Sequence, residues 1–236
     1  MKKVFLNLIL VCLSVSIFAQ SKSLEQKIKD EDVQECVLYK GGEEIQGYIK
    51  KMVVYDYETI FPAPWLYQKQ IRFIPKDVFE KTEKIKGKMY VSYEPKDCDG
   101  YKCDSKEYVS VKYSDMSAVG MSMIPKKIFM QKVLDGKVSI FYHYQEPPVV
   151  MTGGAAPYYI ECGKEEIVYQ IGENGKLKLL NNLNIDKEMA DCPYVIDKWS
   201  KGEYNKVAGK KVLSVILNDN LNKKVEAILD YNSNCK

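Results

Sequence analysis

A series of short apolar segments between residues 34 and 180 constrains the fold more than any other feature of the sequence. Most of these segments are rich in Val, Ile, Tyr and Phe, which suit the pleated, half-buried surface of a sheet, and turn-forming residues separate them. They cover residues 35–39, 44–52, 65–73, 88–93, 108–113, 127–134, 137–144, 158–162 and 166–171. Short strands that follow one another without long helices between them predict an antiparallel sheet or a partly closed barrel.

The dipeptide Asp135-Gly136, between two of these segments, predicts a hairpin. Asp-Gly tolerates the positive φ angles that a tight two-residue turn requires. The strand that follows alternates between two faces. We expect the core face to carry Val138, Ile140, Tyr142 and Tyr144, and the opposite face to carry Ser139, Phe141, His143 and Gln145.

After residue 184 the apolar pattern becomes helical. Asp191 precedes Cys192-Pro193, which predicts a helix N-cap followed closely by a proline in the first turn. Apolar residues then recur at helical spacing at Val207, Val212, Val215 and Ile216, and after a polar break at Leu221, Val225, Ile228 and Leu229. The predicted fold class is therefore α+β. An antiparallel β-sheet or partly closed barrel forms a β-rich domain at 20–183, and a C-terminal helical region at 184–236 packs on it.

The N-terminus has the three parts of a secretory signal peptide in order. Lys2 and Lys3 give the positive start, the stretch 4–18 is apolar, and Ala19 offers a small residue for cleavage before Gln20. A membrane-spanning helix needs about 20 apolar residues, which favours a cleaved signal at 1–19 over an anchor. We therefore expect an exported protein of the periplasm or the extracellular medium, with no membrane span in the mature chain.

Six cysteines remain once the signal is removed, and an even number in an exported chain predicts disulfide bonds. They are Cys36, Cys98, Cys103, Cys162, Cys192 and Cys235. Cys98 and Cys103 flank a turn-forming insert, so their spacing predicts a small closed loop. Cys192 and Cys235 bracket the helical region, and we expect them to tie its ends together. The chain has no Cys-x-x-Cys motif and a single histidine, which disfavours a metal site, and no cofactor is expected.

Several function classes lack their signature residues. His143 is the only histidine, so every catalytic arrangement that depends on histidine would have to use it, and no Gly-x-Ser-x-Gly elbow accompanies it. The sequence contains neither a phosphate-binding Gly-x-x-x-x-Gly-Lys nor a dinucleotide fingerprint. The 35 basic and 32 acidic residues nearly balance, which gives no electrostatic reason to expect nucleic acid as a partner.

The segment 145–157 is the strongest candidate for a binding site. It joins two predicted strands, contains Pro147-Pro148 and Gly153-Gly154, and has an apolar tip. The candidate binding residues are Val149, Val150, Met151 and the nearby Tyr158. A disordered or passive loop tip is the competing interpretation.

These observations favour a non-enzymatic binding or interaction protein of the cell envelope or medium, with a protein or a small ligand as its partner. One alternative is an extracytoplasmic hydrolase built on carboxylates, which needs no histidine. Another is a small-ligand carrier, which would hold an open apolar cavity inside the sheet.

Four stretches of the mature chain resemble a group of uncharacterised secreted proteins common in Bacteroidota. They are IPKDVFEK followed by YVSY at 74–93, KKIFMQKVLDGKVSIFYHY at 126–144, YYIECGKEE at 158–166, and DCPYVIDKW with a terminal YNSNC at 191–235. The resemblance implies export and a sheet-plus-helices architecture, and it carries over no catalytic or binding residue.

Overall fold

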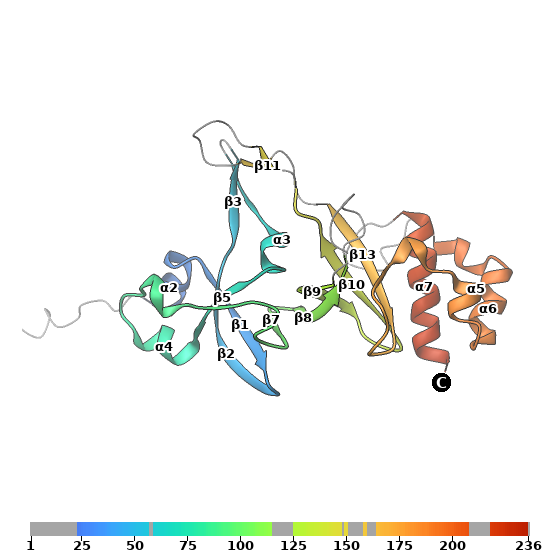
Figure 1. Cartoon of the computed structure of the whole chain (residues 1–236), viewed down its shortest axis with the longest axis horizontal. Helices are drawn as coiled ribbons and strands as arrows, with labels where there is room; N and C mark the ends of the chain where they lie inside the picture. Colours follow the sequence, from blue (N-terminus) through green and yellow to red (C-terminus); the bar gives the residue numbers. More distant parts are fainter. Residues whose placement is uncertain are drawn as a thin grey trace, which may run out of the picture.

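The computed structural model describes residues 23–56, 59–114, 125–147, 149–150, 158–159, 164–207 and 218–235. Its body is an open, ten-stranded antiparallel sheet with the strand order β14-β13-β10-β9-β8-β7-β1-β2-β5-β6. The sheet runs across the molecule, from the short helices α2 and α4 at one end to the helices α5, α6 and α7 at the other (Figure 1). The predicted α+β class is confirmed, and the sheet is not closed into a barrel.

The strands of this sheet are β1 (Val33–Lys40), β2 (Glu43–Lys50), β5 (Ile71–Pro75), β6 (Val91–Tyr93), β7 (Gly100–Cys103), β8 (Lys106–Tyr113), β9 (Lys126–Leu134), β10 (Val138–Tyr144), β13 (Glu165–Ile171) and β14 (Lys178–Leu179). Two hairpins lie outside it: β3 (Val53–Asp56) with β4 (Thr59–Pro62), and β11 (Val149–Val150) with β12 (Tyr158–Tyr159). The helices are α2 (Leu24–Asp30), α3 (Pro64–Tyr67), α4 (Lys76–Lys81), α5 (Ile185–Glu188), α6 (Pro193–Ser200) and α7 (Asp219–Asn234), with 3-10 turns η1 (Gly87–Met89), η2 (Leu180–Asn182) and η3 (Glu203–Val207).

The predicted strand at 65–73 is wrong in its first half. Pro64 is the first residue of α3, where its fixed φ angle suits a helix start, and strand β5 begins only at Ile71. In the same way, the segment 88–93 begins within η1 and becomes a strand only at Val91. Both segments are rich in apolar and aromatic residues, and such composition does not separate a short buried helical turn from a strand.

The hairpin predicted at Asp135-Gly136 is confirmed, with residues 135–137 between strands β9 and β10. The expected core face of β10 is also correct, because Val138, Ile140 and Tyr142 are buried. The opposite face is buried as well, since Phe141 packs with residues of β8, β9 and β13 in a second apolar cluster. Strand β10 therefore lies between two packed layers.

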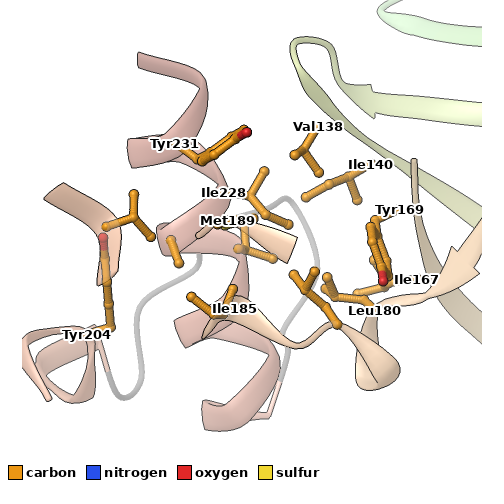
Figure 2. Close-up of a cluster of buried hydrophobic side chains, with 14 of the residues drawn as sticks. Val138, Ile140, Ile167, Tyr169, Leu180, Ile185, Met189, Tyr204, Ile228 and Tyr231 are labelled. Atoms are coloured by element: carbon orange, nitrogen blue, oxygen red, sulfur yellow. The ribbon is translucent and has the colours of Figure 1, made fainter. Parts of the chain in front are cut away.

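The first layer is the largest core cluster, formed where the C-terminal helices cover β10 and β13. Figure 2 shows Ile185, Met189 and Ile228 of the helices on one side of this cluster and Ile140 and Tyr169 of the sheet on the other. The apolar spacing at 221–229 belongs to α7, and Asn218 caps this helix by accepting the Leu221 N–H. The spacing at 207–216 falls, apart from Val207 at the end of η3, outside the described residues.

The predicted N-cap at Asp191 is wrong by one residue. Cys192 is the N-cap of α6, and Pro193 is its first residue. Asp191 instead accepts the hydroxyl of Tyr231 through both carboxylate oxygens, at 2.9 and 2.8 Å. Its carboxylate therefore joins the segment before α6 to α7 rather than closing the first turn of α6.

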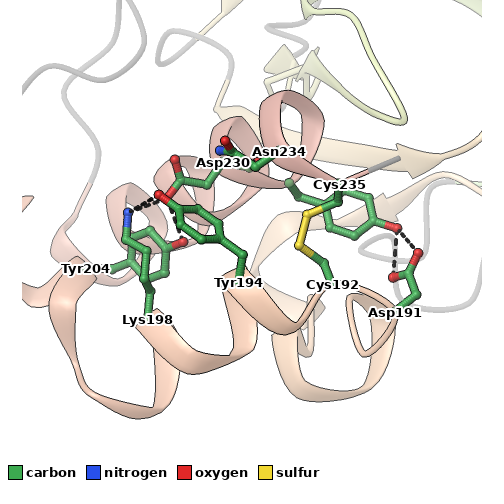
Figure 3. The surroundings of a disulfide bond; sticks show 9 residues. Asp191, Cys192, Tyr194, Lys198, Tyr204, Asp230, Asn234 and Cys235 are labelled. Carbon is green, nitrogen blue, oxygen red and sulfur yellow. Dashed lines mark hydrogen bonds and ion pairs between the residues drawn. A yellow bond between two sulfur atoms is a disulfide. The ribbon is translucent and has the colours of Figure 1, made fainter.

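Two disulfide bonds join described residues. Cys192 pairs with Cys235, as predicted, and links the start of α6 to the end of α7 (Figure 3). Cys103 pairs with Cys36 and not with Cys98, so the predicted small loop is wrong. The reason is the strand order: β7 lies beside β1, which makes Cys36 and Cys103 directly opposite partners with Cα atoms 4.3 Å apart.

The two remaining predicted cysteines are Cys98 and Cys162. Cys98 carries a free, buried thiol whose pKa is raised to about 11, chiefly by burial. Cys162 lies outside the described residues. The prediction that all six cysteines form disulfides is therefore wrong for Cys98, and it stays a prediction for Cys162.

One side-chain amide fastens α7 to the β9–β10 hairpin. Asn232 accepts the Val138 N–H through Oδ1 at 2.9 Å, and its Nδ2 donates to the Val138 carbonyl at 2.8 Å. The approach is close because Gly136 has no side chain: a Cβ there would lie 2.5 Å from Nδ2 of Asn232.

We expect Asn232→Ala to lower the free energy of unfolding by about 1–3 kcal/mol, because it leaves two half-buried backbone groups of Val138 without partners. Asn234→Ala is the matched control on the same helix. Asn234 is exposed and donates to the carbonyl of Asp230, one turn earlier on the same helix, at 3.1 Å, so its loss should change stability by less than about 0.5 kcal/mol. Urea unfolding of the two variants measures the difference, and equal effects would contradict the role given to Asn232.

Candidate functional site

Two hairpins from distant parts of the chain meet away from the main sheet. Strands β3 and β4 pair from Val53 opposite Pro62 to Asp56 opposite Thr59, and β12 lies beside β3. Figure 1 shows β3 rising away from the sheet, with β11 near its far end. We call β3, β4, β11 and β12 together the arm.

The arm contains three of the four predicted binding residues. Val149 lies opposite Tyr159, and Val150 lies opposite Tyr158. Met151 falls outside the described residues. The predicted loop is therefore, in part, a short hairpin, and the backbone brings it next to a second hairpin that sequence reasoning missed. The signal for that second hairpin was present, because Val53-Val54-Tyr55 and Ile60-Phe61 are β-branched and aromatic on both sides of a polar break.

The side-chain amide of Gln68 joins the roots of the two hairpins. Its Nε2 donates to the carbonyl of Tyr144 at 2.7 Å, and its Oε1 accepts the Tyr144 N–H at 2.8 Å. Gln68 follows α3, which comes directly after the β3–β4 hairpin, whereas Tyr144 ends β10 and leads toward β11. Since Gln68 is only 5% exposed, these bonds are shielded from water.

Apolar side chains also pack together beside Gln68, at the base of the arm. Trp65 and Ala63 are almost fully buried and pack with Leu66 and Tyr144. Trp65 lies on α3, between the β3–β4 hairpin and Gln68. A large ring at this point fills the space between the foot of the hairpin and the sheet, so the base of the arm has an apolar core of its own.

Hydrogen bonds from two backbone N–H groups close the foot of the β3–β4 hairpin. The Met52 N–H donates to the hydroxyl of Tyr67 at 2.8 Å, and the Ala63 N–H donates to the Met52 carbonyl at 3.3 Å. Burial raises the pKa of Tyr67, while the bond from Met52 acts in the opposite direction. The phenol is therefore neutral at physiological pH and keeps its proton for donation.

A chain of hydrogen bonds joins the segment that enters the β11–β12 hairpin, at Gln145, to the segment that leaves it, at Lys164. We call these two segments the legs of the hairpin. The Gln145 N–H donates to the Lys164 carbonyl at 2.8 Å, and its side-chain Nε2 donates to Glu166 at 2.8 Å. The other carboxylate oxygen of Glu166 lies 3.1 Å from Nδ1 of His143. The ring of Tyr113 lies against that imidazole, with 4.9 Å between ring centroids.

Glu165 points to the opposite face of β13 from Glu166. Burial raises its pKa, with Lys106 acting in the opposite direction. Its Oε1 is buried and has no hydrogen-bond partner among the described residues. Tyr144, its cross-strand neighbour, also has a pKa raised by burial and then by Glu165 itself. Paired and unpaired carboxylate oxygens of described residues therefore lie close together where β10 ends and β13 begins.

Two of the surface pockets that described residues form lie away from the arm. One, of about 290 Å³, is lined by Tyr169, Ile171, Gly175, Lys176, Lys178 and Glu188. Burial acts to raise the pKa of Glu188, but hydrogen bonds from Lys178 and Tyr169 outweigh it and hold the pKa below its usual value. Its carboxylate is thus already engaged by neighbours at 2.8 and 2.7 Å.

The second pocket, of about 320 Å³, lies on the face of β1, β2 and β7 that carries Val37 and Tyr39. It is lined by Glu35, Cys36, Val37, Tyr39, Glu44, Gln46, Lys102 and Asp104. Its acidic groups do not converge on one point, because within the described part of the chain no three His, Cys, Asp or Glu side chains gather closely enough to hold a metal ion.

Comparison with known proteins does not assign this site to a family. No protein-family model, curated protein or solved structure matches the chain. The resemblance to secreted proteins of Bacteroidota therefore stays a prediction. Among the described residues, no helix combines the length and the apolar character that crossing a bilayer requires.

Proposed function

We propose that the protein is an exported interaction protein that contacts a protein partner through the arm. The observation that carries this proposal is the meeting of two hairpins, at 53–62 and 149–159, on one base away from the main sheet. The arm rises from the body of the molecule (Figure 1), and a projecting element suits a protein surface better than a small ligand, which is usually bound in a concave site.

The composition of the arm supports a protein partner. Its four strands carry a high share of aromatic and β-branched residues: Val53, Val54, Tyr55, Ile60, Phe61, Val149, Val150, Tyr158 and Tyr159. Aromatic residues are enriched in protein interfaces, and tyrosine and tryptophan are frequent among the few residues that dominate the binding energy.

The rigid base supports the same proposal. Gln68 and Trp65 contact Tyr144 at the end of β10, and Tyr67 holds the foot of the β3–β4 hairpin through Met52. A surface held in its binding geometry loses less conformational entropy on association, which raises affinity without new contacts.

Export is supported by two independent features. Residues 1–19 have the composition of a cleaved signal peptide. The two disulfide bonds fit an oxidising compartment, since such bonds are rare where thiols are kept reduced.

Site-specific photo-crosslinking in the native host tests the proposal. A benzoylphenylalanine at Tyr55 and another at Tyr158 probe the two hairpins separately, and one at Tyr194 of α6, which is 48% exposed, is the matched control. We expect both arm positions to capture the same protein and the control position not to capture it. With that partner purified, Ile60→Asp is expected to weaken binding at least about tenfold. Equal capture from all three positions, or no capture from the arm, would count against the proposal.

A further inference from the structure

We propose that His143 is a proton-sensitive latch on the legs of the β11–β12 hairpin, so that the pH outside the cytoplasm regulates the arm. This inference rests on the proposed function, because it concerns the control of the same surface. It is carried by the position of the single histidine of the chain at the point where both legs of the hairpin meet the sheet.

The contacts form one continuous chain of bonds. The bond from the Gln145 N–H to the Lys164 carbonyl closes the two legs against each other. Glu166, just after Lys164, holds the side chain of Gln145 with one oxygen and faces His143 with the other. A change in the His143–Glu166 pair therefore acts on the hydrogen bond between Gln145 and Lys164 through the side chain of Gln145.

The pair is shielded from water. The side chain of His143 is 7% exposed and that of Glu166 is 12% exposed. From β8 the phenol of Tyr113 packs against the imidazole, and β9 contributes the apolar Met130 to the same side of the sheet. Among the described residues, the charged group that contacts His143 is the carboxylate of Glu166.

Protonation of His143 changes the bond to Glu166 from a neutral–ionic hydrogen bond to an ion pair. Charge-assisted bonds of this kind are shorter and stronger than those with one neutral partner. Histidine is the side chain whose ordinary titration lies between pH 5 and 8, and the chain has no second one. We therefore expect the legs to be held more firmly at mildly acidic pH and to loosen as the pH rises.

Glu165 is the competing titratable group at this place. It neighbours Glu166 in sequence, lies on the other face of β13, and burial raises its pKa. A pH effect that comes from Glu165 would not involve His143. Glu165→Gln is consequently the control that removes the second candidate.

Amide hydrogen exchange, corrected for intrinsic rates, tests the latch without any partner. In the full chain we expect the protection of the Gln145 amide to fall about fivefold between pH 5 and pH 8. The single imidazole signal in an NMR titration should change over the same pH interval. His143→Asn keeps an N–H donor near the position of Nδ1 and should make the protection independent of pH, whereas Glu165→Gln should leave the pH dependence intact.

Three outcomes separate the ideas. Constant protection in the native chain, or a pH dependence that survives in His143→Asn, would overturn the latch. A pH dependence lost in Glu165→Gln would assign the effect to the other carboxylate and overturn it as well. Because these readouts need no partner, crosslinking can fail while the latch stands, and the arm can bind a partner at constant affinity from pH 5 to 8 while the latch fails.

Discussion

Replacing Cys36 and Cys103 together by alanine is expected to lower the free energy of unfolding by about 4 kcal/mol. The bond joins residues 67 apart in sequence, and closing a loop of that length removes much of the conformational entropy of the unfolded chain. The loss should be larger than that from any single surface substitution. Urea unfolding followed by circular dichroism, under conditions that keep the remaining disulfide intact, measures it.

Cys98→Ala is the matched control for this pair. Cys98 is buried in the same apolar cluster as Cys36 and Cys103 but carries a free thiol. Its replacement removes one buried sulfur atom and no cross-link, so we expect a loss of about 1 kcal/mol. If Cys98 were bonded to Cys103, then Cys98→Ala would break a cross-link while Cys36→Ala would not, so a larger loss of stability from Cys98→Ala than from Cys36→Ala would contradict the observed pairing.

Mass spectrometry adds a second readout to the same experiment. Burial raises the pKa of Cys98 to about 11, and only the thiolate reacts with alkylating reagents. In the folded protein at pH 8 we therefore expect Cys98 to be modified slowly, and to be modified at once after unfolding. Rapid labelling of the folded protein would show that the thiol is more accessible than the structure indicates.

The cysteines illustrate what local sequence patterns decide and what they leave open. The Cys192–Cys235 pairing was predictable because the two residues bracket one helical unit, so their proximity follows from local structure. The Cys36–Cys103 pairing depends on β7 lying beside β1, which is a property of the strand order. No spacing along the chain contains that information, and the short Cys98–Cys103 spacing pointed to the wrong partner.

The same limit applies to the candidate site. The strands and the hairpin at Asp135-Gly136 follow from composition and turn chemistry, which act over a few residues. The candidate binding loop was also recognisable from its length and its apolar tip. Its partner in the arm, the β3–β4 hairpin, is about ninety residues away in sequence, and their meeting depends on contacts such as that of Gln68 with Tyr144. Residues that anchor an arm look like ordinary apolar and amide residues until the fold places them together.

Trp65→Ala tests whether the base of the arm is as firmly built as these contacts indicate. Trp65 is 1% exposed, and removal of a buried tryptophan side chain generally costs about 3–5 kcal/mol, because it loses apolar burial and leaves a cavity. The amides of Met52 and Ala63, which close the foot of the β3–β4 hairpin, should exchange faster than those of the C-terminal helices. The chain has two tryptophans, so Trp199 on α6 remains as a fluorescence reporter of the helical region.

Trp199→Ala is the matched control, since it removes the same side chain from a site that is only partly buried, beside Tyr204. We expect it to destabilise less than Trp65→Ala and to leave crosslinking from the arm unchanged. Trp65→Phe should recover part of the lost stability, because an aromatic ring of smaller size fills part of the cavity. If Trp65→Ala speeds exchange equally in α7 and in the arm, the base of the arm unfolds only with the whole protein. If exchange rises at the foot of the arm alone and crosslinking from Tyr55 is lost, then Trp65 holds the arm in the geometry that its partner recognises.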